Sequence, residues 1–173
     1  GGRVIRDGVF SAAGLVDLQV NGFRGLDFNT LPIPPELPGR LTRELWTVGV
    51  TSYCPTLITN SPAAITEGLR SVADACRRDP DARKGIAGIH LEGPFLSREN
   101  GPRGAHERRW IRKPDLALLR RWIDASEGLL RILTLAPEWP GSPRFIERCT
   151  AMGVSVSIGH TAATPEQIAD AVK

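Results

Sequence analysis

Glu92 is an ionisable side chain in an otherwise apolar segment, GIHLEGP, at positions 88–94. An apolar run ends there in a carboxylate, and Gly93 and Pro94 follow it directly. A carboxylate at the end of a buried strand costs desolvation free energy unless a positive partner compensates it. A metal ion is one such partner, and an arginine from another strand is the other. The residues alone leave both interpretations open.

His160 repeats this situation, because the apolar run VSVSIG at positions 154–159 ends in its imidazole. Carboxylate and neutral imidazole together form a partial ligand set for zinc or iron(II), and catalytic zinc commonly has three protein ligands. Glu92 and His160 are the two credible ligands in the sequence. A histidine at a strand end is also commonly a hydrogen-bonded structural residue, so the pair alone makes a metal site a hypothesis.

The sequence has three histidines, and the other two are His90 and His106. His90 shares a strand face with Glu92, two residues away, and could be a ligand in an H-x-E arrangement. We favour a position one layer deeper, from which it orients the site by hydrogen bonding. His106 lies in a long irregular segment, and such segments in compact domains are usually functional or mobile. We expect a substrate contact there, with an exposed, solvated histidine as the alternative.

Five continuous apolar runs predict the strands that must position these residues. They lack polar alternation, as expected of parallel strands that are covered on both faces. The runs are Gly14–Val20, Val50–Pro55, Ile86–Leu91, Ile132–Ala136 and Val154–Ile158.

Helical patterns lie between these runs, and most begin at a proline after a polar capping residue. We expect helix starts at Pro62, Pro114, Pro143 and Pro165, and a further helix within residues 34–48. The expected inner stripes are Ile65, Leu69, Val72 and Cys76 in the first of these, Leu116, Leu119 and Ile123 in the second, and Phe145, Ile146 and Cys149 in the third.

The alternation of strand and helix predicts a parallel α/β sheet, either a doubly wound sheet or part of a (β/α)₈ TIM-type barrel. No dinucleotide-binding or phosphate-binding glycine motif follows any expected strand. Polar residues at the carboxyl ends of the strands favour the barrel, whose active sites lie at that rim. They are Gln19, Asn21, Thr56, Glu92, Glu138 and His160.

A complete barrel needs eight strands and about 250 residues. Five strands would leave two unpaired edges and an open apolar interior. We therefore expect a chain of 173 residues to be an incomplete barrel that stops at Lys173 within a helix, with an unusual self-sufficient domain as the weaker alternative.

Composition excludes several classes of function. The formal net charge is +3, and the basic pairs Arg108-Arg109 and Arg120-Arg121 are short, so no nucleic-acid motif is present. Three cysteines without a C-x-x-C pair argue against a disulfide framework. No apolar run approaches the ~20 residues of a membrane span, and no signal-peptide pattern opens the chain. We expect a cytoplasmic protein without nucleic-acid or membrane partners.

Six segments, in this order, resemble motifs of the N-acetylglucosamine-6-phosphate deacetylases of the amidohydrolase superfamily. They are GLVDLQVNG at 14–22, PTLIT at 55–59, HLEGPF at 90–95, RKPD at 112–115, LAPE at 135–138 and GHT at 159–161. The resemblance runs from about residue 14 to residue 173. It implies hydrolysis of N-acetylglucosamine 6-phosphate to glucosamine 6-phosphate and acetate.

The resemblance also implies a domain arrangement and a site. Residues 1–12 would be a remnant of a small β-sandwich, and residues 13–173 the first five βα units of the barrel. Glu92 corresponds to the carboxylate metal ligand and His160 to the first histidine ligand. Ala105 and His106 correspond to the pair that contacts the sugar phosphate.

Gln19 and Asn21 depart from the H-x-H that many amidohydrolases use to hold a second metal. A subset of the deacetylases is similar in having Q-x-N and one metal. We therefore expect a single divalent ion, zinc with iron(II) as the alternative, and expect Gln19, Asn21 and His90 to be vestigial metal positions or supports behind the ligands.

The resemblance places the remaining histidine ligand, the phosphate-binding arginine and the catalytic aspartate after Lys173, so no catalytic residue is assigned in this chain. It also implies a homodimer. Two alternatives stay open at this point. One is a deacetylase of another N-acetylhexosamine phosphate, such as N-acetylgalactosamine 6-phosphate, and the other is a non-catalytic barrel fragment that binds or scaffolds.

Overall fold

The computed structural model describes residues 3–6 and 9–173 and contains one parallel sheet of five strands. The order in the sheet is β3-β6-β7-β8-β9, which is also the order along the chain. The strands are β3 (Leu15–Val20), β6 (Val50–Ile58), β7 (Ile89–Glu92), β8 (Leu130–Leu135) and β9 (Ser155–Ile158). A doubly wound sheet would reverse its strand order at a switch point. This sheet does not, and the predicted partial (β/α)₈ barrel is confirmed.

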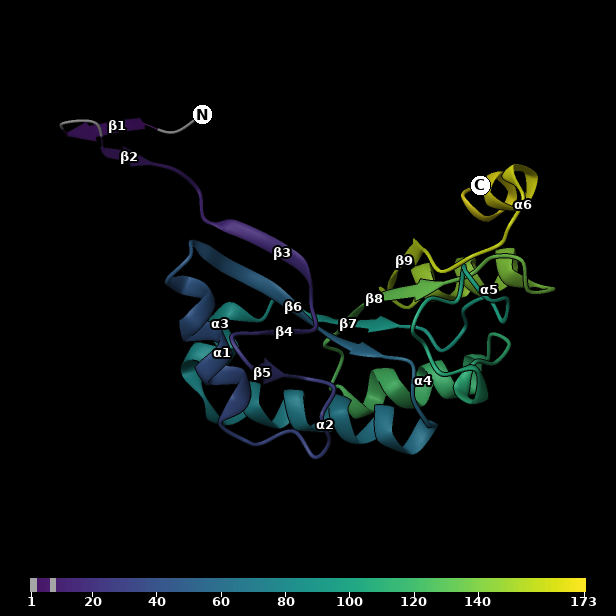
Figure 1. The fold of residues 1–173 in the computed structure, drawn as a ribbon, viewed down its shortest axis with the longest axis horizontal. Helices are drawn as coiled ribbons and strands as arrows, with labels where there is room; N and C mark the ends of the chain where they lie inside the picture. The colour runs from purple at the N-terminus through teal and green to yellow at the C-terminus, as the bar shows by residue number, and fades with distance from the viewer. Residues whose placement is uncertain (1–2, 7–8) are drawn as a thin grey trace.

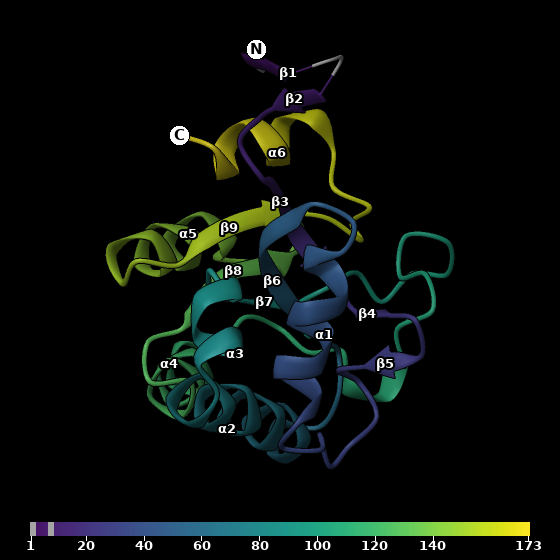
Figure 2. The same ribbon diagram turned by 90° about the vertical axis from the view of Figure 1, so that its left-hand side faces the viewer.

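Helices follow the strands and, except for the last one at the C-terminus, cover one face of the sheet (Figure 1). They are α1 (Leu37–Trp46), α2 (Pro62–Arg78), α3 (Pro80–Gly85), α4 (Leu116–Ala125), α5 (Ser142–Ala151) and α6 (Pro165–Ala171), with a 3₁₀ turn η1 (Arg108–Trp110) before α4. Figure 2 looks roughly along the strands and shows α1, α2, α4 and α5 as an arc around the outer side of the curled sheet. The opposite, inner face carries none of these four helices.

Side-chain capping explains where several helices begin. Ser61 accepts a hydrogen bond from the Ala64 N–H before α2, and Thr164 forms a capping box with Gln167 at the start of α6. The predicted starts at Pro62 and Pro165 are therefore confirmed. The start predicted at Pro114 was two residues early, because Asp115 caps α4 by accepting from the N–H groups of its first turn. The short helix α3 was not predicted.

Two small antiparallel hairpins also lie outside the predictions. One joins β4 (Gly22–Phe23) to β5 (Leu26–Asp27) through Arg24 and Gly25, both of which have positive φ, as a tight two-residue turn requires. The other pairs β1 (Arg3–Arg6) with β2 (Val9–Ser11). Residues 1–2 and 7–8 lie outside the described residues, and the assignment of residues 1–12 to a β-sandwich stays a prediction.

The core lies between the sheet and its helices and contains a cluster of aromatic rings. The Phe95 ring lies 5.8 Å from the Trp122 ring and 5.3 Å from the Phe145 ring, centroid to centroid. Trp122 is fully buried on α4, together with Leu119. The stripe predicted for this helix included Leu119 but omitted Trp122, the largest fully buried side chain in the described part of the chain.

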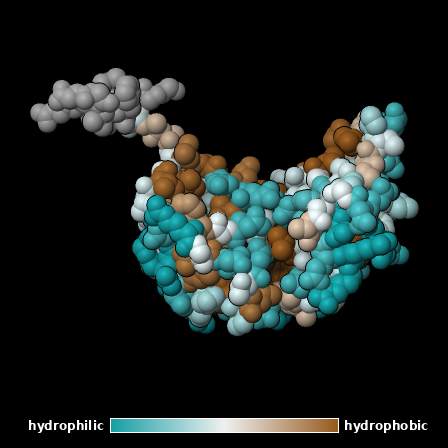
Figure 3. All heavy atoms as spheres, viewed as in Figure 1, coloured by the Kyte–Doolittle hydropathy of each residue, from teal (hydrophilic) through white to brown (hydrophobic). Residues whose placement is uncertain are grey.

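The two edge strands are more exposed than predicted. Leu15, Val16 and Leu18 of β3 are 61%, 61% and 57% exposed, although an apolar run there predicted burial on both faces. The reason is that β3 is an edge strand of this sheet, as is β9, so each lacks a neighbour on one side. Figure 3 shows apolar surface near both ends of the open side. The two unpaired edges that were expected are thus present among the described residues, whereas the central strand β7 is buried along its length.

The described helices include none that combines the length and the apolar character of a membrane span.

Candidate metal centre

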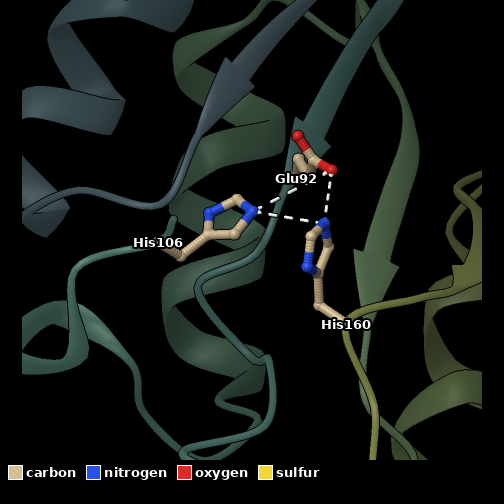
Figure 4. A group of neighbouring side chains, drawn as sticks. All are labelled: Glu92, His106 and His160. Atoms are coloured by element: carbon tan, nitrogen blue, oxygen red, sulfur yellow. Dashed lines mark hydrogen bonds and ion pairs between the residues drawn. The ribbon is translucent and has the colours of Figure 1, made fainter. Parts of the chain in front are cut away.

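Three potential metal-binding side chains meet at the carboxyl end of the sheet (Figure 4). Glu92 ends β7, His160 follows β9 after Gly159, and His106 comes from the irregular segment between β7 and α4. The distance from His160 Nε2 to Glu92 Oε1 is 2.9 Å, and His106 Nε2 lies 3.3 Å from His160 Nε2 and 3.9 Å from Glu92 Oε1. The structure thus brings Glu92 and His160 together, while their role as ligands stays a prediction.

Sharp turns at two strand ends aim these side chains. Gly93 has a φ of +86°, and a Cβ at this position would collide with the Thr59 hydroxyl oxygen. The Gly93 N–H donates to Thr134 O, so the turn after Glu92 stays fastened to β8. His160 itself has a φ of +51°, a left-handed conformation that is uncommon outside glycine. Each turn ends its strand abruptly and leaves a side chain at the rim.

The proton positions on His160 follow from its partners. Its Nδ1 lies 3.1 Å from Pro102 O, and a carbonyl can only accept, so Nδ1 carries the proton. In the neutral ring, Nε2 then presents a lone pair to Glu92 Oε1 at 2.9 Å. Two acceptors at this distance repel each other unless positive charge lies between them. A proton that makes His160 an imidazolium would supply that charge, and so would a metal cation.

Glu92 is 8% exposed and has few other partners that compensate its charge. Gln19 Nε2 donates to Glu92 Oε1 over 3.2 Å, so the end of β3 adjoins the carboxylate. Within the described chain, Asn21 makes no hydrogen bond to Glu92, His106 or His160, and its backbone carbonyl accepts from Phe28. The structure therefore brings one of the two Q-x-N residues to the centre.

His90 is buried behind Glu92, and both of its ring nitrogens have partners. Nδ1 lies 3.0 Å from Leu18 O and therefore donates, and Nε2 lies 2.7 Å from the Thr134 hydroxyl and accepts from it. Burial lowers the pKa of His90, so the ring is neutral near pH 7. These contacts support an orienting role, because neither nitrogen is available to a cation.

His106 is buried, which contradicts the alternative of an exposed, solvated histidine: its exposure is 7%. Burial lowers the pKa of His106, and the nearby His160 adds to this effect. Ala105, its predicted companion in substrate contact, is exposed. Among the described residues, His106 Nδ1 is a buried atom without a hydrogen-bond partner.

Some of the residues that hold the centre were given no specific role by the sequence, although Glu138 was expected at the rim. Pro102 fixes the tautomer of His160, and its sequence context gives no signal for a role that depends on a backbone carbonyl. Glu138 accepts hydrogen bonds from the Thr161 hydroxyl and the Ala162 N–H and thereby holds the turn after His160. Burial opposes the ionisation of Glu138, but these hydrogen bonds outweigh it and lower the pKa of the carboxyl group. The sequence feature that indicated Glu138 was its position just after the expected strand at 132–136.

The donor set fits a divalent cation. A carboxylate oxygen and imidazole nitrogens are ligands that zinc and iron(II) share, and the site lies at a partly buried strand edge where an uncompensated carboxylate is costly. The facing His160 Nε2 and Glu92 Oε1 would be satisfied by such a cation, as they would be by a proton on the imidazole.

The buried, neutral state of His90 makes a prediction about stability and pH. In the unfolded chain a histidine has a pKa of about 6.5, whereas burial lowers it in the folded chain. Between these values the unfolded chain binds more protons, so the contribution of His90 is full above the unfolded pKa and is lost as the pH falls. We expect the stability of the metal-free wild type, relative to His90→Asn, to decrease from about pH 7.5 to about pH 5.5. Urea unfolding of both proteins measures this difference, and a constant or growing advantage of the wild type would contradict it.

Known proteins resemble the chain in sequence. No family model matches it. The human N-acetylglucosamine-6-phosphate deacetylase is 36% identical over 99% of this chain and 40% of its own length. The enzyme of the same name from Bacillus subtilis is 33% identical over 92% of this chain and 40% of its own length.

Solved structures give the same result for the fold. The N-acetyl-D-glucosamine-6-phosphate deacetylase of Mycobacterium smegmatis matches with a TM-score of 0.81 and 32% identity, over 92% of this chain and 43% of that one. A mutant of that enzyme in complex with N-acetyl-D-glucosamine-6-phosphate matches with a TM-score of 0.82. The chain spans about two fifths of the length of the curated relatives it matches. Over nearly its whole length, the chain is therefore a relative of the N-acetylglucosamine-6-phosphate deacetylases in both sequence and fold.

Proposed function

We propose that this chain supplies the metal-binding part of an active site that hydrolyses N-acetylglucosamine 6-phosphate to glucosamine 6-phosphate and acetate. The single observation that carries the proposal is the 2.9 Å approach of His160 Nε2 to Glu92 Oε1, with the imidazole proton held on the other nitrogen. The proposed substrate is taken from the names of the relatives. The His160–Glu92 pair gives a chemical reason to expect a cation at the place where that substrate would be hydrolysed.

In this proposal Glu92 and His160 hold one divalent ion, zinc with iron(II) as the alternative. A bound cation of this kind supplies Lewis acidity, which polarises a carbonyl and makes water a better nucleophile. The protein groups prepare the site. Pro102 O keeps the His160 proton on Nδ1. Gln19, at a position where many amidohydrolases have a histidine ligand for a second metal, donates a hydrogen bond to Glu92 instead. The net reaction breaks the amide C–N bond, with the water oxygen going to the acetyl carbon and a proton to the amine.

Further parts of the proposal come from the resemblance alone. They are contacts of Ala105 and His106 with the sugar phosphate, a homodimer, a cytoplasmic location, and a β-sandwich that includes residues 1–12. The structure of a relative in complex with N-acetyl-D-glucosamine-6-phosphate supports the class of ligand.

A second candidate substrate has an observation of its own. An N-acetylgalactosamine-6-phosphate deacetylase from Escherichia coli O157:H7 is 32% identical over 94% of this chain and 42% of its own length. The two sugars differ at C4, and the described site contains no residue assigned to that hydroxyl. Parallel assays with both sugar phosphates, compared by kcat/KM, separate the candidates.

The test of the proposed function is to change the two ligands in the full-length protein. We expect Glu92→Gln and His160→Ala to lower bound metal and acetate release together, because each removes a donor atom of the site. Metal content is measured by elemental analysis and turnover by acetate release from N-acetylglucosamine 6-phosphate. Glu147→Gln, at an exposed position on α5, is the matched control and should change neither.

Two results would count against this function. Normal turnover with stoichiometric metal in either ligand variant would remove Glu92 and His160 from the site. Full metal binding by the wild type without any acetate release from either sugar phosphate would favour a binding or scaffolding role instead.

A further inference from the structure

We infer that Glu138 is a positioning residue for the proposed reaction, because it fixes the direction in which His160 presents its imidazole to Glu92. The inference rests on the proposed function, in which His160 holds the cation. Glu138 bonds to Thr161 and Ala162, the two residues after His160, so it acts on that ring through the backbone.

The first observation is the backbone conformation of His160. Its φ of +51° is left-handed, which a residue with a Cβ keeps only where the surrounding structure holds it. The chain before this residue is held by the sheet, because the Gly159 N–H donates to Leu135 O over 3.1 Å. A change of φ at His160 would rotate the imidazole about the N–Cα bond and away from Glu92. The chain after His160 must therefore be held as well.

Glu138 holds that part of the chain with both of its carboxylate oxygens. The Thr161 hydroxyl donates to Oε2, and the Ala162 N–H donates to Oε1 over 3.2 Å. The Thr161 oxygen in turn accepts from the Ala163 N–H over 2.9 Å, which closes the turn. Hydrogen bonds to a carboxylate are stronger than those to a neutral acceptor. A glutamine has one acceptor oxygen, so it would lose one of the two bonds to the turn.

The loop that carries Glu138 is fixed on its other side, toward the segment after β7. The Ala136 N–H donates to Phe95 O over 2.9 Å. Trp139 Nε1 donates to Leu96 O over 3.1 Å. Glu138 therefore joins the turn after β9 to a loop that is already fastened to its other neighbour.

Two contacts depend on this arrangement. The Ser97 N–H donates to His160 O over 2.9 Å, and His160 Nδ1 donates to Pro102 O over 3.1 Å. Both need the carbonyl and the ring of His160 to keep their directions, because a hydrogen bond weakens steeply when its angle closes. Without Glu138 the turn would relax, and the Nδ1 proton would lose its acceptor.

The kinetic test compares Glu138→Gln with Glu147→Gln, the same change at an exposed position on α5, in the full-length protein. We expect Glu138→Gln to lower kcat for acetate release by about 10-fold, the lower end of what groups behind a metal ligand contribute. KM should change little, because the predicted substrate contacts, Ala105 and His106, lie in a different segment. The control should change neither constant.

A second pair of variants tests the contact itself. Thr161→Val keeps the shape of the side chain and removes its hydroxyl, whereas Thr161→Ser keeps the hydroxyl. We expect Thr161→Val to lower kcat as Glu138→Gln does, and Thr161→Ser to remain close to the wild type. In the double variant of Glu138→Gln and Thr161→Val the two losses should not add, because both break the same contact.

A measurement on the metal-free protein separates positioning from general structural support. Two ring protons are held by backbone carbonyls: that on His160 Nδ1 by Pro102 O, and that on His90 Nδ1 by Leu18 O. Their exchange with solvent is followed in ¹H–¹⁵N spectra of the imidazoles. In Glu138→Gln we expect exchange at His160 to become faster and exchange at His90 to stay as in the wild type.

Two outcomes would overturn the inference and leave the proposed function intact. One is a wild-type kcat together with unchanged exchange at His160 in Glu138→Gln. The other is faster exchange at His90 as well as at His160, because Glu138 would then support the structure in general. A wild type that releases no acetate from either sugar phosphate would instead contradict the proposed function, and the exchange comparison would still show whether Glu138 holds the His160 ring.

Discussion

Replacing Glu92 with alanine is expected to weaken Zn²⁺ binding by the full-length protein by more than about 100-fold, a larger loss than substitutions behind a ligand produce. Glu92 Oε1 lies 2.9 Å from His160 Nε2 and 3.9 Å from His106 Nε2, and it supplies the negative charge of the candidate metal centre. The measurement is a competition titration with a chelator. Glu147→Ala, at an exposed position on α5, removes a carboxylate elsewhere and should bind as the wild type does.

The same variant should separate metal binding from folding. A ligand that binds the folded chain stabilises it by about 2.7 kcal/mol at a concentration 100 times its Kd. Zn²⁺ should therefore raise the unfolding temperature of the wild type and of Glu147→Ala but not that of Glu92→Ala. A zinc-dependent stabilisation of equal size in all three proteins would show that the ion binds somewhere other than Glu92.

Replacing Trp122 with alanine is expected to lower the free energy of unfolding by about 3–5 kcal/mol. Trp122 is fully buried on α4 and packs its ring against Phe95, in the segment that follows Glu92 directly. Removing it leaves a cavity beneath the strand end that positions the candidate metal centre. Urea unfolding followed by circular dichroism measures the loss.

Trp122→Phe is the matched variant for this prediction. It keeps an aromatic ring beside Phe95 and removes an indole N–H that, within the described chain, is buried without a hydrogen-bond partner. We expect it to cost much less than the alanine variant. Equal losses in the two variants would mean that ring packing is not what Trp122 contributes.

The strand order and the meeting of Glu92 with His160 could be predicted from the sequence. Apolar runs located all five strands, and parallel strands bring their carboxyl ends to one edge. The Gly93-Pro94 pair after Glu92 and the Gly159 before His160 then marked where these strands end. These signals are local and depend on residue type, so they can be recognised without knowledge of the tertiary structure.

The position of His106 could not be predicted in this way. Its approach to the centre depends on Gly104, on the Pro102 carbonyl and on the hydrogen bond from Ser97, all within an irregular segment. Backbone carbonyls and loop paths have no periodic pattern in sequence. The apolar run of β3 did not indicate its exposure, because such a run shows what a strand would bury but not whether a neighbour covers it. The exposure follows instead from the two unpaired edges expected of five strands.

The central claim is that Glu92 and His160 bind the same divalent cation. Anomalous scattering at the zinc absorption edge, from a crystal of the chain grown with Zn²⁺, tests it most directly. We predict one strong peak about 2.0–2.2 Å from both Glu92 Oε1 and His160 Nε2. A refined structure in which the two side chains face different sides of the sheet, or in which zinc binds elsewhere while they form a plain ion pair, would contradict the claim.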